Sequence, residues 1–332
     1  MTDLRPLPTD RRPRIAVLDD YMGVAHRLVP WAQIEARADV DFLHEPIAQG
    51  QVGVEQLSRY DAICLLRERT AFPAELLAQL PDLKAIVATG RQNRTLDYGA
   101  ARELGIAVMT TTGSGNGIYA TAELAWGLIL GLMRHIPEES AAMREGGWQT
   151  RLGNALWGKT IGIIGLGKLG SRMALIAKAF GMEPVAWSPN LTRERATEAG
   201  ATYLDKRALL AEADVVSLHL VLGPTTRGII GKADLAQMKP DAVLINTARG
   251  PLVDEQSLMD ALRENRIGGA GIDVYDQEPL AADHPIRTLH NALVTPHLGY
   301  SVQETFEAFY RETVENLESW LDGRPIRLAD NK

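Results

Sequence analysis

The chain has 332 residues, of which 45% are hydrophobic and 23% are charged, values typical of an ordinary globular protein with room for two domains. The formal net charge is −7 and no basic tract stands out, which disfavours nucleic acid as a partner. No apolar stretch approaches membrane-spanning length, so we expect no membrane contact. The single cysteine, Cys64, lies in an apolar run and is expected to be a buried thiol. Without a disulfide within the chain, we infer a reducing, cytoplasmic setting, and we predict no metal site.

The first third of the chain alternates between strand and helix patterns. Short apolar runs that end in polar or glycine-containing turns predict strands at 14–18, 40–43, 62–66, 85–88 and 107–109. Helical patterns lie between them, for example at 74–80 and 98–104. This alternation predicts a doubly wound α/β domain with a parallel sheet.

A second series of strands and helices follows a glycine-rich break at 112–117, which we interpret as a hinge or linker. The helix expected at about 120–134 is apolar on several faces, which indicates burial between domains or subunits. A last helix, at 305–321, comes after the second sheet is complete and could return to the first domain. The second series comprises strands at 161–164, 183–187, 215–218, 242–245, 270–274 and 292–295, and helices at 206–211 and 254–264.

Three glycines, Gly165, Gly167 and Gly170, stand between an apolar strand and an apolar stretch at helical spacing. This is the context that the dinucleotide fingerprint requires. The first glycine permits a sharp turn, the second removes a side chain where a pyrophosphate approaches the backbone, and the third lets helix and strand pack closely. The helix N-terminus then offers free N–H groups to the phosphates. The segment therefore predicts a dinucleotide site.

The acidic residue that binds the adenine ribose in many such sites is missing. It is expected at the end of the next strand, about 20 residues on, where this chain has Ser188. A carboxylate there would repel a 2′-phosphate, so Ser188 removes a barrier to NADP. Arg193 and Arg195 could supply positive charge, or could simply be solvated residues at a helix start. The sequence leaves the choice between NAD and NADP open.

Three further candidates, Arg249, Glu278 and His297, each follow an apolar strand. Ligands of open parallel sheets bind beyond the carboxyl ends of the strands, so these side chains can converge on the nicotinamide. An imidazole can protonate a carbonyl oxygen near neutral pH, a carboxylate can orient it, and a guanidinium can grip a carboxylate with two hydrogen bonds. Each residue alone also has a structural explanation, as a strand-end cap, a turn residue or a loop histidine.

The chain resembles, over nearly its whole length, the D-isomer-specific 2-hydroxyacid dehydrogenases, which include glyoxylate, hydroxypyruvate and phosphoglycerate dehydrogenases. The motifs that carry this resemblance are GKTIGIIGLGKLG at 158–170, NTARG at 246–250, GAGIDV at 269–274 with Glu278-Pro279, and TPHLG at 295–299.

The resemblance implies two Rossmann-like doubly wound domains with the cofactor domain inserted into the catalytic domain. Residues 1–116 and 302–332 would form a flavodoxin-like substrate domain, and 117–301 the NAD(P)-binding Rossmann domain. It also implies a homodimer that makes contact through the helix near 120–145. Arg249 would bind substrate, Glu278 would partner the histidine and His297 would be the acid/base. The implied cofactor-binding residues are Gly165, Gly167, Lys168, Leu169, Gly170, Ser188, Leu220, Thr247, Ala248, Asp273 and Gly299.

The loop at 90–97 departs from the family pattern. Relatives usually have Gly-x-Gly-x-Asp-Asn there, with backbone N–H groups that bind the substrate carboxylate, whereas this chain has Gly90, Arg91, Gln92 and Asn93. The first three are our candidate substrate-binding residues. Arg91 could favour a second acidic group on the substrate, or it could face outward. The usual His-x-Pro-Leu-Thr appears as HLVLG at 219–223, which changes the shape of a loop.

The resulting hypothesis is a reversible hydride transfer between NAD(P)H and a small 2-oxo acid or D-2-hydroxy acid, with His297 as acid/base. The alternative is a dinucleotide-binding, corepressor-like regulator of the same fold without significant turnover, because fold does not determine function. An oxo-acid panel combined with a cofactor titration separates the two.

Overall fold

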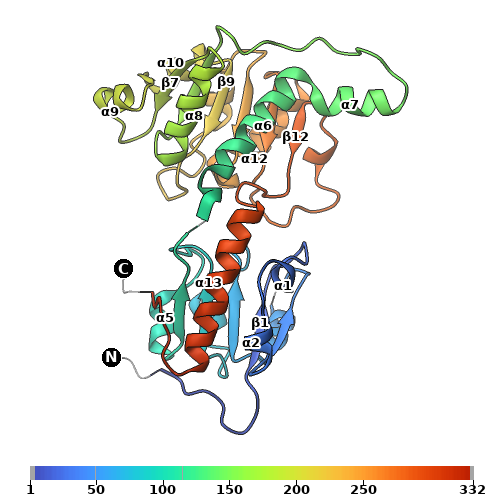
Figure 1. The fold of residues 1–332 in the computed structure, drawn as a ribbon. Coiled ribbons are helices and arrows are strands. Elements are labelled where there is room, and N and C mark those ends of the chain that lie inside the picture. Colours follow the sequence, from blue (N-terminus) through green and yellow to red (C-terminus); the bar gives the residue numbers. More distant parts are fainter. Residues whose placement is uncertain (1–3, 49, 114, 330–332) are drawn as a thin grey trace. The chain divides into compact units, whose positions relative to one another are not determined.

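The computed structural model describes residues 4–48, 50–113 and 115–329, so the extreme ends of the predicted substrate domain lie outside the described residues. The chain divides into two compact units, which are described separately (Figure 1). Unit 1 comprises Met1–Ile118 and Val302–Lys332, and unit 2 comprises Tyr119–Ser301. Each unit is built on one parallel sheet, which confirms the predicted doubly wound α/β fold class.

Unit 1 holds a five-stranded sheet in the order β2-β1-β3-β4-β5, the flavodoxin-like order. Every residue of β3 and β4, two of the three inner strands, is buried, as expected for a parallel sheet covered on both faces. The register pairs Val17 with Phe42 and with Cys64, so β1, β2 and β3 end together at one edge. The strands are β1 (Arg14–Val17), β2 (Asp39–Phe42), β3 (Ala62–Leu65), β4 (Ala85–Ala88) and β5 (Ala107–Thr110).

Short helices connect the strands of unit 1, and one long helix returns from the end of the chain. This helix, α13 (Gln303–Leu321), packs against β4 and β5 and against the first two helices (Figure 1). The helix expected at 74–80 is shorter than predicted, because Gln79 and Leu80 form tight i→i−3 turns just before Pro81. The short helices are α1 (Ala25–Leu28), α2 (Ala32–Glu35), α3 (Gln51–Leu57), α4 (Ala74–Leu77) and α5 (Tyr98–Glu103).

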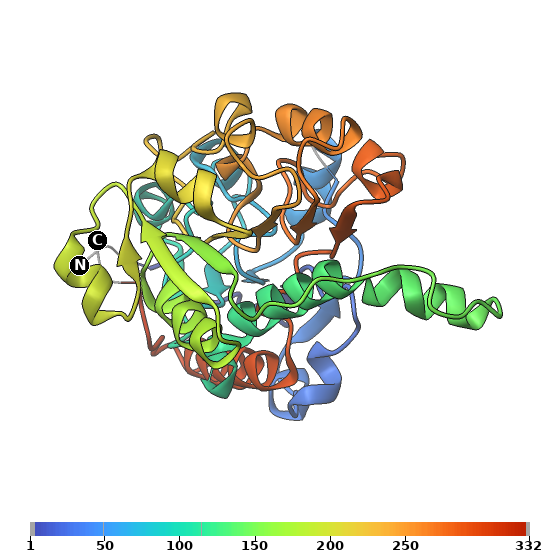
Figure 2. The same cartoon turned by 90° about the horizontal axis from the view of Figure 1, so that it is seen from above.

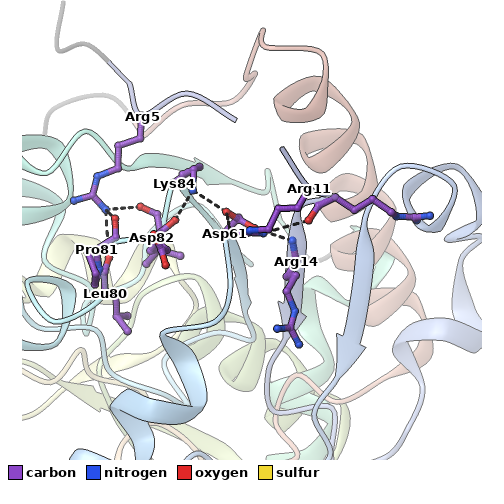
Figure 3. Close-up of polar contacts among 10 residues, drawn as sticks. Arg5, Arg11, Arg14, Asp61, Leu80, Pro81, Asp82 and Lys84 are labelled. Carbon is purple, nitrogen blue, oxygen red and sulfur yellow. Dashed lines mark hydrogen bonds and ion pairs between the residues drawn. The ribbon is translucent and has the colours of Figure 1, made fainter. Parts of the chain in front are cut away.

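A buried carboxylate joins the N-terminal segment to the amino ends of the unit 1 strands (Figure 3). Asp61 is fully buried and accepts hydrogen bonds from Arg11 at 2.6 and 3.0 Å, from Lys84 Nζ at 2.7 Å and from the Arg14 N–H at 2.8 Å. Burial raises the pKa of Asp61, but the two cations and the N–H group lower it further, so its pKa lies below the ordinary value. The carboxylate is therefore ionised and holds residues 11–14 against the sheet.

Unit 2 holds a seven-stranded sheet in the order β12-β11-β10-β9-β6-β7-β8, which is the dinucleotide-binding order with one further strand. The order reverses between β6 and β9, the point beside which ligands of such sheets bind. Four consecutive strands of this sheet, β9, β10, β11 and most of β6, are buried. The strands are β6 (Thr160–Ile164), β7 (Glu183–Trp187), β8 (Thr202–Tyr203), β9 (Val215–Leu218), β10 (Val243–Asn246), β11 (Gly269–Ile272) and β12 (Ala292–Val294).

Polar N-cap residues start several of the unit 2 helices. Thr192, Asp205 and Asp254 each accept a hydrogen bond from the backbone N–H three residues on. The predicted long helix is α6 (Ala120–Arg134), whose buried residues pack on β10, β11 and α8 of its own unit. The other helices are α7 (Ile136–Arg144), α8 (Lys168–Ala179), α9 (Arg193–Glu198), α10 (Lys206–Glu212), α11 (Lys232–Leu235) and α12 (Glu255–Arg263), with 3₁₀ turns η1 (Gly115–Tyr119), η2 (Gly250–Leu252) and η3 (Pro285–Thr288).

Helix α7 is not packed into the core of unit 2. No residue of α7 is buried, and the helix extends beyond the rest of unit 2 (Figure 2). Apolar side chains along it and on the segment that follows are exposed: Ile136, Met143, Trp148, Leu152 and Trp157. Separately, none of the helices in the described ranges is both long enough and apolar enough to cross a membrane.

Candidate active site

Two of the three fingerprint glycines of unit 2 occupy positions where a side chain would meet the backbone, and the third faces open space. Gly165 has φ +102°, and a Cβ there would lie 2.7 Å from the backbone of His219. A Cβ on Gly170 would lie 2.1 Å from the carbonyl oxygen of Gly165, so helix α8 can approach the turn only because this residue is glycine. At Gly167 a Cβ would point into open space. The turn therefore has one open face, and it lies at the N-terminus of α8.

The backbone at this open face has unused hydrogen-bond donors. Gly167 is the N-cap of α8 and provides no side-chain cap. Among the described residues, no acceptor is found for the N–H groups of residues 166–170, and the first helical hydrogen bond runs from Ser171 to Gly167. Free N–H groups at a helix N-terminus, with no Cβ in the way, fit the pyrophosphate of a dinucleotide. Lys168 and Leu169, both expected to contact cofactor, supply the first two of the helical N–H groups.

The end of β7 lies beside this turn. The Gly165 N–H donates to the carbonyl oxygen of Trp187 at 2.8 Å, and Ser188 follows directly. The Leu191 N–H donates to the Ser188 carbonyl oxygen at 3.1 Å, which closes a tight turn over residues 188–191. Ser188 is half-buried and is thus placed where an adenine ribose would bind next to the phosphate-binding turn.

Arg249 lies in the loop after β10. The loop is held by Asn246, whose side chain donates to the Arg249 carbonyl oxygen at 2.9 Å and accepts from the Ala248 N–H at 3.1 Å. The half-buried guanidinium donates from Nη1 to the Ala248 carbonyl oxygen at 2.6 Å. Gly250 brings this loop against the next one, since a Cβ on it would lie 2.1 Å from the Tyr275 backbone.

Glu278 and His297 meet at the carboxyl ends of β11 and β12. His297 Nδ1 lies 2.5 Å from Glu278 Oε2, and Glu278 Oε1 accepts from the Tyr275 N–H at 2.9 Å. Their side chains are 23% and 28% exposed, respectively. Removal from water raises the pKa of Glu278, but hydrogen bonds from His297 and Tyr275 and the charge of Arg249 outweigh this, so its pKa lies below the ordinary value.

This pair fixes the direction of the imidazole. Because Nδ1 is bound to the carboxylate, Nε2 is the ring nitrogen left for a ligand, and it has no hydrogen-bond partner among the described residues. The charge of Arg249 reaches Glu278, which places all three predicted catalytic residues in one neighbourhood of unit 2. One ring nitrogen of His297 is thus left for a ligand, and the charge of Arg249 acts on the carboxylate that holds the other.

Asp273 anchors the loop that carries His297. It is fully buried and accepts hydrogen bonds from the Thr295 hydroxyl at 2.6 Å, the Leu298 N–H at 2.7 Å and the Gly299 N–H at 2.9 Å. Burial raises the pKa of Asp273 despite these bonds. Sequence reasoning placed Asp273 near the nicotinamide and did not foresee this role. Thr295 was not selected either, although a hydroxyl two residues before a candidate histidine was the available signal.

The other predicted cofactor residues lie along the same edge of the unit 2 sheet. Leu220 and Ala248 are partly buried against the hydrophobic core, and Gly299 accepts a hydrogen bond from the Thr121 hydroxyl at 2.7 Å. Thr247 Oγ1 is buried and has no hydrogen-bond partner among the described residues, which is consistent with a ligand group at that position. His219, in the altered 219–223 segment, is within 2.9 Å of the Ser217 hydroxyl, and burial lowers its pKa to about 4.

The predicted substrate loop belongs to unit 1. Gly90 has φ +88° and donates its N–H to the Thr111 hydroxyl at 2.7 Å. Arg91 and Gln92 are exposed, and their N–H groups find no acceptor in the described part of the chain. Arg91 Nε donates to the Thr112 carbonyl oxygen at 2.6 Å. The Arg67 guanidinium covers Gly90, where a Cβ would lie 1.7 Å from Nη1.

Comparison with known proteins identifies the class. The family model described as D-isomer specific 2-hydroxyacid dehydrogenase, NAD binding domain, matches residues 126–299. The chain therefore belongs to the D-isomer-specific 2-hydroxyacid dehydrogenase family, as the sequence motifs predicted. The family model supports an NAD(P) cofactor for unit 2.

Individual relatives agree with this assignment. The chain is 37% identical to a D-3-phosphoglycerate dehydrogenase of Synechocystis sp. over 84% of its length and 50% of that protein. It is 39% identical to a glyoxylate reductase of Aeropyrum pernix, over 75% of this chain and 77% of that one. The solved structure of a phosphoglycerate oxidoreductase from Vibrio cholerae O395 superposes with a TM-score of 0.86 at 37% identity, over 94% and 99% of the two chains. The chain spans about half the length of the phosphoglycerate dehydrogenases that it matches.

Proposed function

We propose that this protein is an NAD(P)-dependent oxidoreductase that interconverts a small 2-oxo acid and the corresponding D-2-hydroxy acid. The carrying observation is the contact of 2.5 Å between His297 Nδ1 and Glu278 Oε2, which leaves Nε2 available to a ligand. When bound, the nicotinamide supplies or accepts a hydride at the C2 carbon of the substrate. The other hydrogen of the reaction is a proton at the substrate oxygen, and His297 is the group suited to carry it.

In the direction of reduction, His297 begins as an imidazolium and donates the Nε2 proton to the carbonyl oxygen as hydride reaches C2. The products would be a hydroxy acid, oxidised NAD(P) and a neutral imidazole, which regains a proton from solvent. Glu278 stabilises the imidazolium by charge and holds the ring through Nδ1. In oxidation the same nitrogen accepts the hydroxyl proton. The step is balanced in both directions.

Arg249 is proposed to bind the substrate carboxylate and to polarise the carbonyl group. A guanidinium presents two parallel N–H donors that match a carboxylate, and this one is fixed in place by its loop. Separately, the unused N–H groups of Arg91 and Gln92, with Gly90, are proposed as the substrate-binding groups of unit 1. The division into a substrate domain at 1–116 with 302–332 and a cofactor domain at 117–301 stays a prediction. A cytoplasmic location likewise remains a prediction.

The direct test is turnover by the purified chain with reduced cofactor on glyoxylate, hydroxypyruvate, pyruvate and longer oxo acids. His297→Ala should lower kcat by roughly 10²- to 10⁴-fold, the usual contribution of a general acid/base. His290→Ala, at an exposed histidine, is the matched control and should leave kcat unchanged. Cofactor binding without turnover on any oxo acid would favour the regulator instead, and full activity of His297→Ala would exclude its proposed role.

We also propose a homodimer, with a second copy of the chain covering α7 and the segment after it. Trp148 and Leu152 are 75% and 94% exposed, an unusual position for large apolar side chains. Light scattering on the intact chain should give twice the chain mass, and Trp148→Ser combined with Leu152→Ser should shift it toward the monomer. The same substitution at Val52, another exposed apolar residue, should have no effect. A monomeric native chain at micromolar concentration would contradict the proposal.

A further inference from the structure

The end of β7 carries information about which dinucleotide the chain uses. We propose that this protein binds NADP(H) in preference to NAD(H), and that Arg195 and Ser188 hold the 2′-phosphate. The inference rests on the proposed function only in that it assumes a dinucleotide at the glycine turn. It adds the identity of the cofactor and the residues that select it.

The first observation is the group at the end of β7. The register pairs Ile164 with Trp187, so β6 and β7 end together and Ser188 lies beside the phosphate-binding turn. A carboxylate at this point would bind both ribose hydroxyls and repel a 2′-phosphate. Ser188 carries a neutral hydroxyl that can donate to a phosphate oxygen, and this hydroxyl makes no hydrogen bond in the described part of the chain. The chain therefore lacks the carboxylate on which a preference for NAD usually depends.

The second observation is the position of Arg195. Its Nη1 donates to the carbonyl oxygen of Asn190 at 3.2 Å, so the guanidinium lies over the 188–191 turn rather than extending into solvent. No carboxylate pairs with it among the described residues. The N–H groups of the guanidinium that Asn190 does not use remain available to an anion. An exposed arginine held at this turn, without an acidic partner, matches the requirement for binding a phosphate dianion.

The other charged groups of the neighbourhood have different partners. Arg193 lies over the Tyr203 ring, with its guanidinium carbon 5.1 Å from the centroid. Lys206 is ion-paired with Asp234 at 2.7 Å. The carboxylate of Glu194 accepts its own backbone N–H and the Thr192 hydroxyl, which lowers its pKa.

Asp205 is likewise engaged, because it caps α10 by accepting the Ala208 N–H at 2.9 Å. Both of these acids are thus engaged at helix starts, and Arg195 is the arginine that contacts the 188–191 turn itself.

The experiment measures binding and does not depend on turnover. The intact chain is titrated with NADPH and NADH by nicotinamide fluorescence, and with 2′,5′-ADP and 5′-AMP, two probes that lack the nicotinamide. Charged hydrogen bonds contribute about 1.5–3 kcal/mol each, so the 2′-phosphate should tighten binding roughly 10- to 100-fold in both pairs. Arg195→Ala should remove most of this ratio while leaving the Kd for NADH and 5′-AMP unchanged.

Two further variants control the result. Ser188→Asp should invert the preference, because the carboxylate repels the phosphate and binds the ribose hydroxyls. Arg207→Ala removes an equally exposed positive charge from α10 and should leave the ratio intact. Equal or tighter binding of NADH by the native chain would overturn the inference and leave the proposed function standing. Loss of affinity for both dinucleotides in Arg195→Ala would overturn the role of that residue, and failure to bind either dinucleotide would overturn both proposals.

Discussion

The fingerprint glycines allow a sharp prediction, because two of them should fail for different reasons when changed to alanine. At Gly167 the backbone has φ −84°, which any residue adopts, and the new Cβ would meet nothing within 4 Å. Folding should lose only about 1 kcal/mol, the difference between glycine and alanine as N-cap. The methyl group would, however, occupy the space through which a pyrophosphate reaches the N–H groups of α8. Loss of one or two charged hydrogen bonds there should raise the Kd for dinucleotide roughly 10- to 100-fold.

At Gly170 the order of effects reverses. The Cβ would lie 2.1 Å from the Gly165 carbonyl oxygen, an atom of the backbone that cannot rotate away, so α8 or the turn must move by about 1 Å. Such overpacking costs about 1–3 kcal/mol, only partly offset by about 1 kcal/mol of better helix propensity. Thermal unfolding and fluorescence titration of both variants form the assay. Unchanged affinity in Gly167→Ala would refute the proposed position of the pyrophosphate, and an unchanged Tm in Gly170→Ala would refute the tight contact.

Three further predictions concern buried or paired carboxylates. Asp61→Asn should lower stability by about 3 kcal/mol, because the buried position loses its charge and the partly buried Lys84 loses its anionic partner, whereas Asn at the exposed Asp10 should have little effect. The pKa of Asp61 is lower in the folded protein than in the unfolded chain, where it is about 4. Its contribution to folding stability is therefore complete above about pH 4 and is lost as the pH falls through the folded pKa. Thermal melts of the native protein and the variant should converge in acid. Glu278→Gln should lower kcat about 10- to 100-fold, since an amide cannot stabilise the imidazolium, and wild-type kcat would exclude the pairing with His297. Asp273→Asn should lower kcat to a similar degree, because the amide nitrogen of Asn would face one of the three donors that Asp273 binds. It should also weaken the protection of the 295–299 amides in hydrogen exchange. Unchanged protection would show that the loop has another anchor.

The sequence was sufficient for the parts of the fold that have a strong local pattern. Each apolar run that was read as a strand is a strand, and the buried strands β3 and β4 show the reason, since parallel strands covered on both faces are continuously apolar. The glycine turn was also predictable, because Gly165 and Gly170 meet steric requirements that only glycine satisfies, and Gly167 leaves the start of α8 open. Of the helices that were missed, α1, α2 and α11 are four residues long and too short to display a period, and α3 has only seven residues.

The candidate site was predictable only to the level of which strand ends carry it. The positions of Glu278 and His297 after β11 and β12 follow from the sheet, but their hydrogen bond depends on the path of two loops. The role of Asp273 could not be read from the sequence for the same reason: a carboxylate after a strand can face a ligand or a neighbouring loop. Asp273 faces the loop because one hydroxyl and two backbone N–H groups of the loop donate to its carboxylate, and these donors lie 22 to 26 residues further along the chain.

The loop at 295–299 shows how the fold commits the imidazole to one direction before any ligand binds. His297 has φ +56°, a left-handed conformation that costs a residue with a Cβ roughly 1–2 kcal/mol. A strained conformation persists only where the surroundings determine it, and here the buried Asp273 binds the chain on both sides of His297, at Thr295 and at Leu298 and Gly299. Glu278 then fixes the ring from a different loop. The backbone and the ring are thus restrained independently, so the two loops hold Nε2 in one position before any substrate binds.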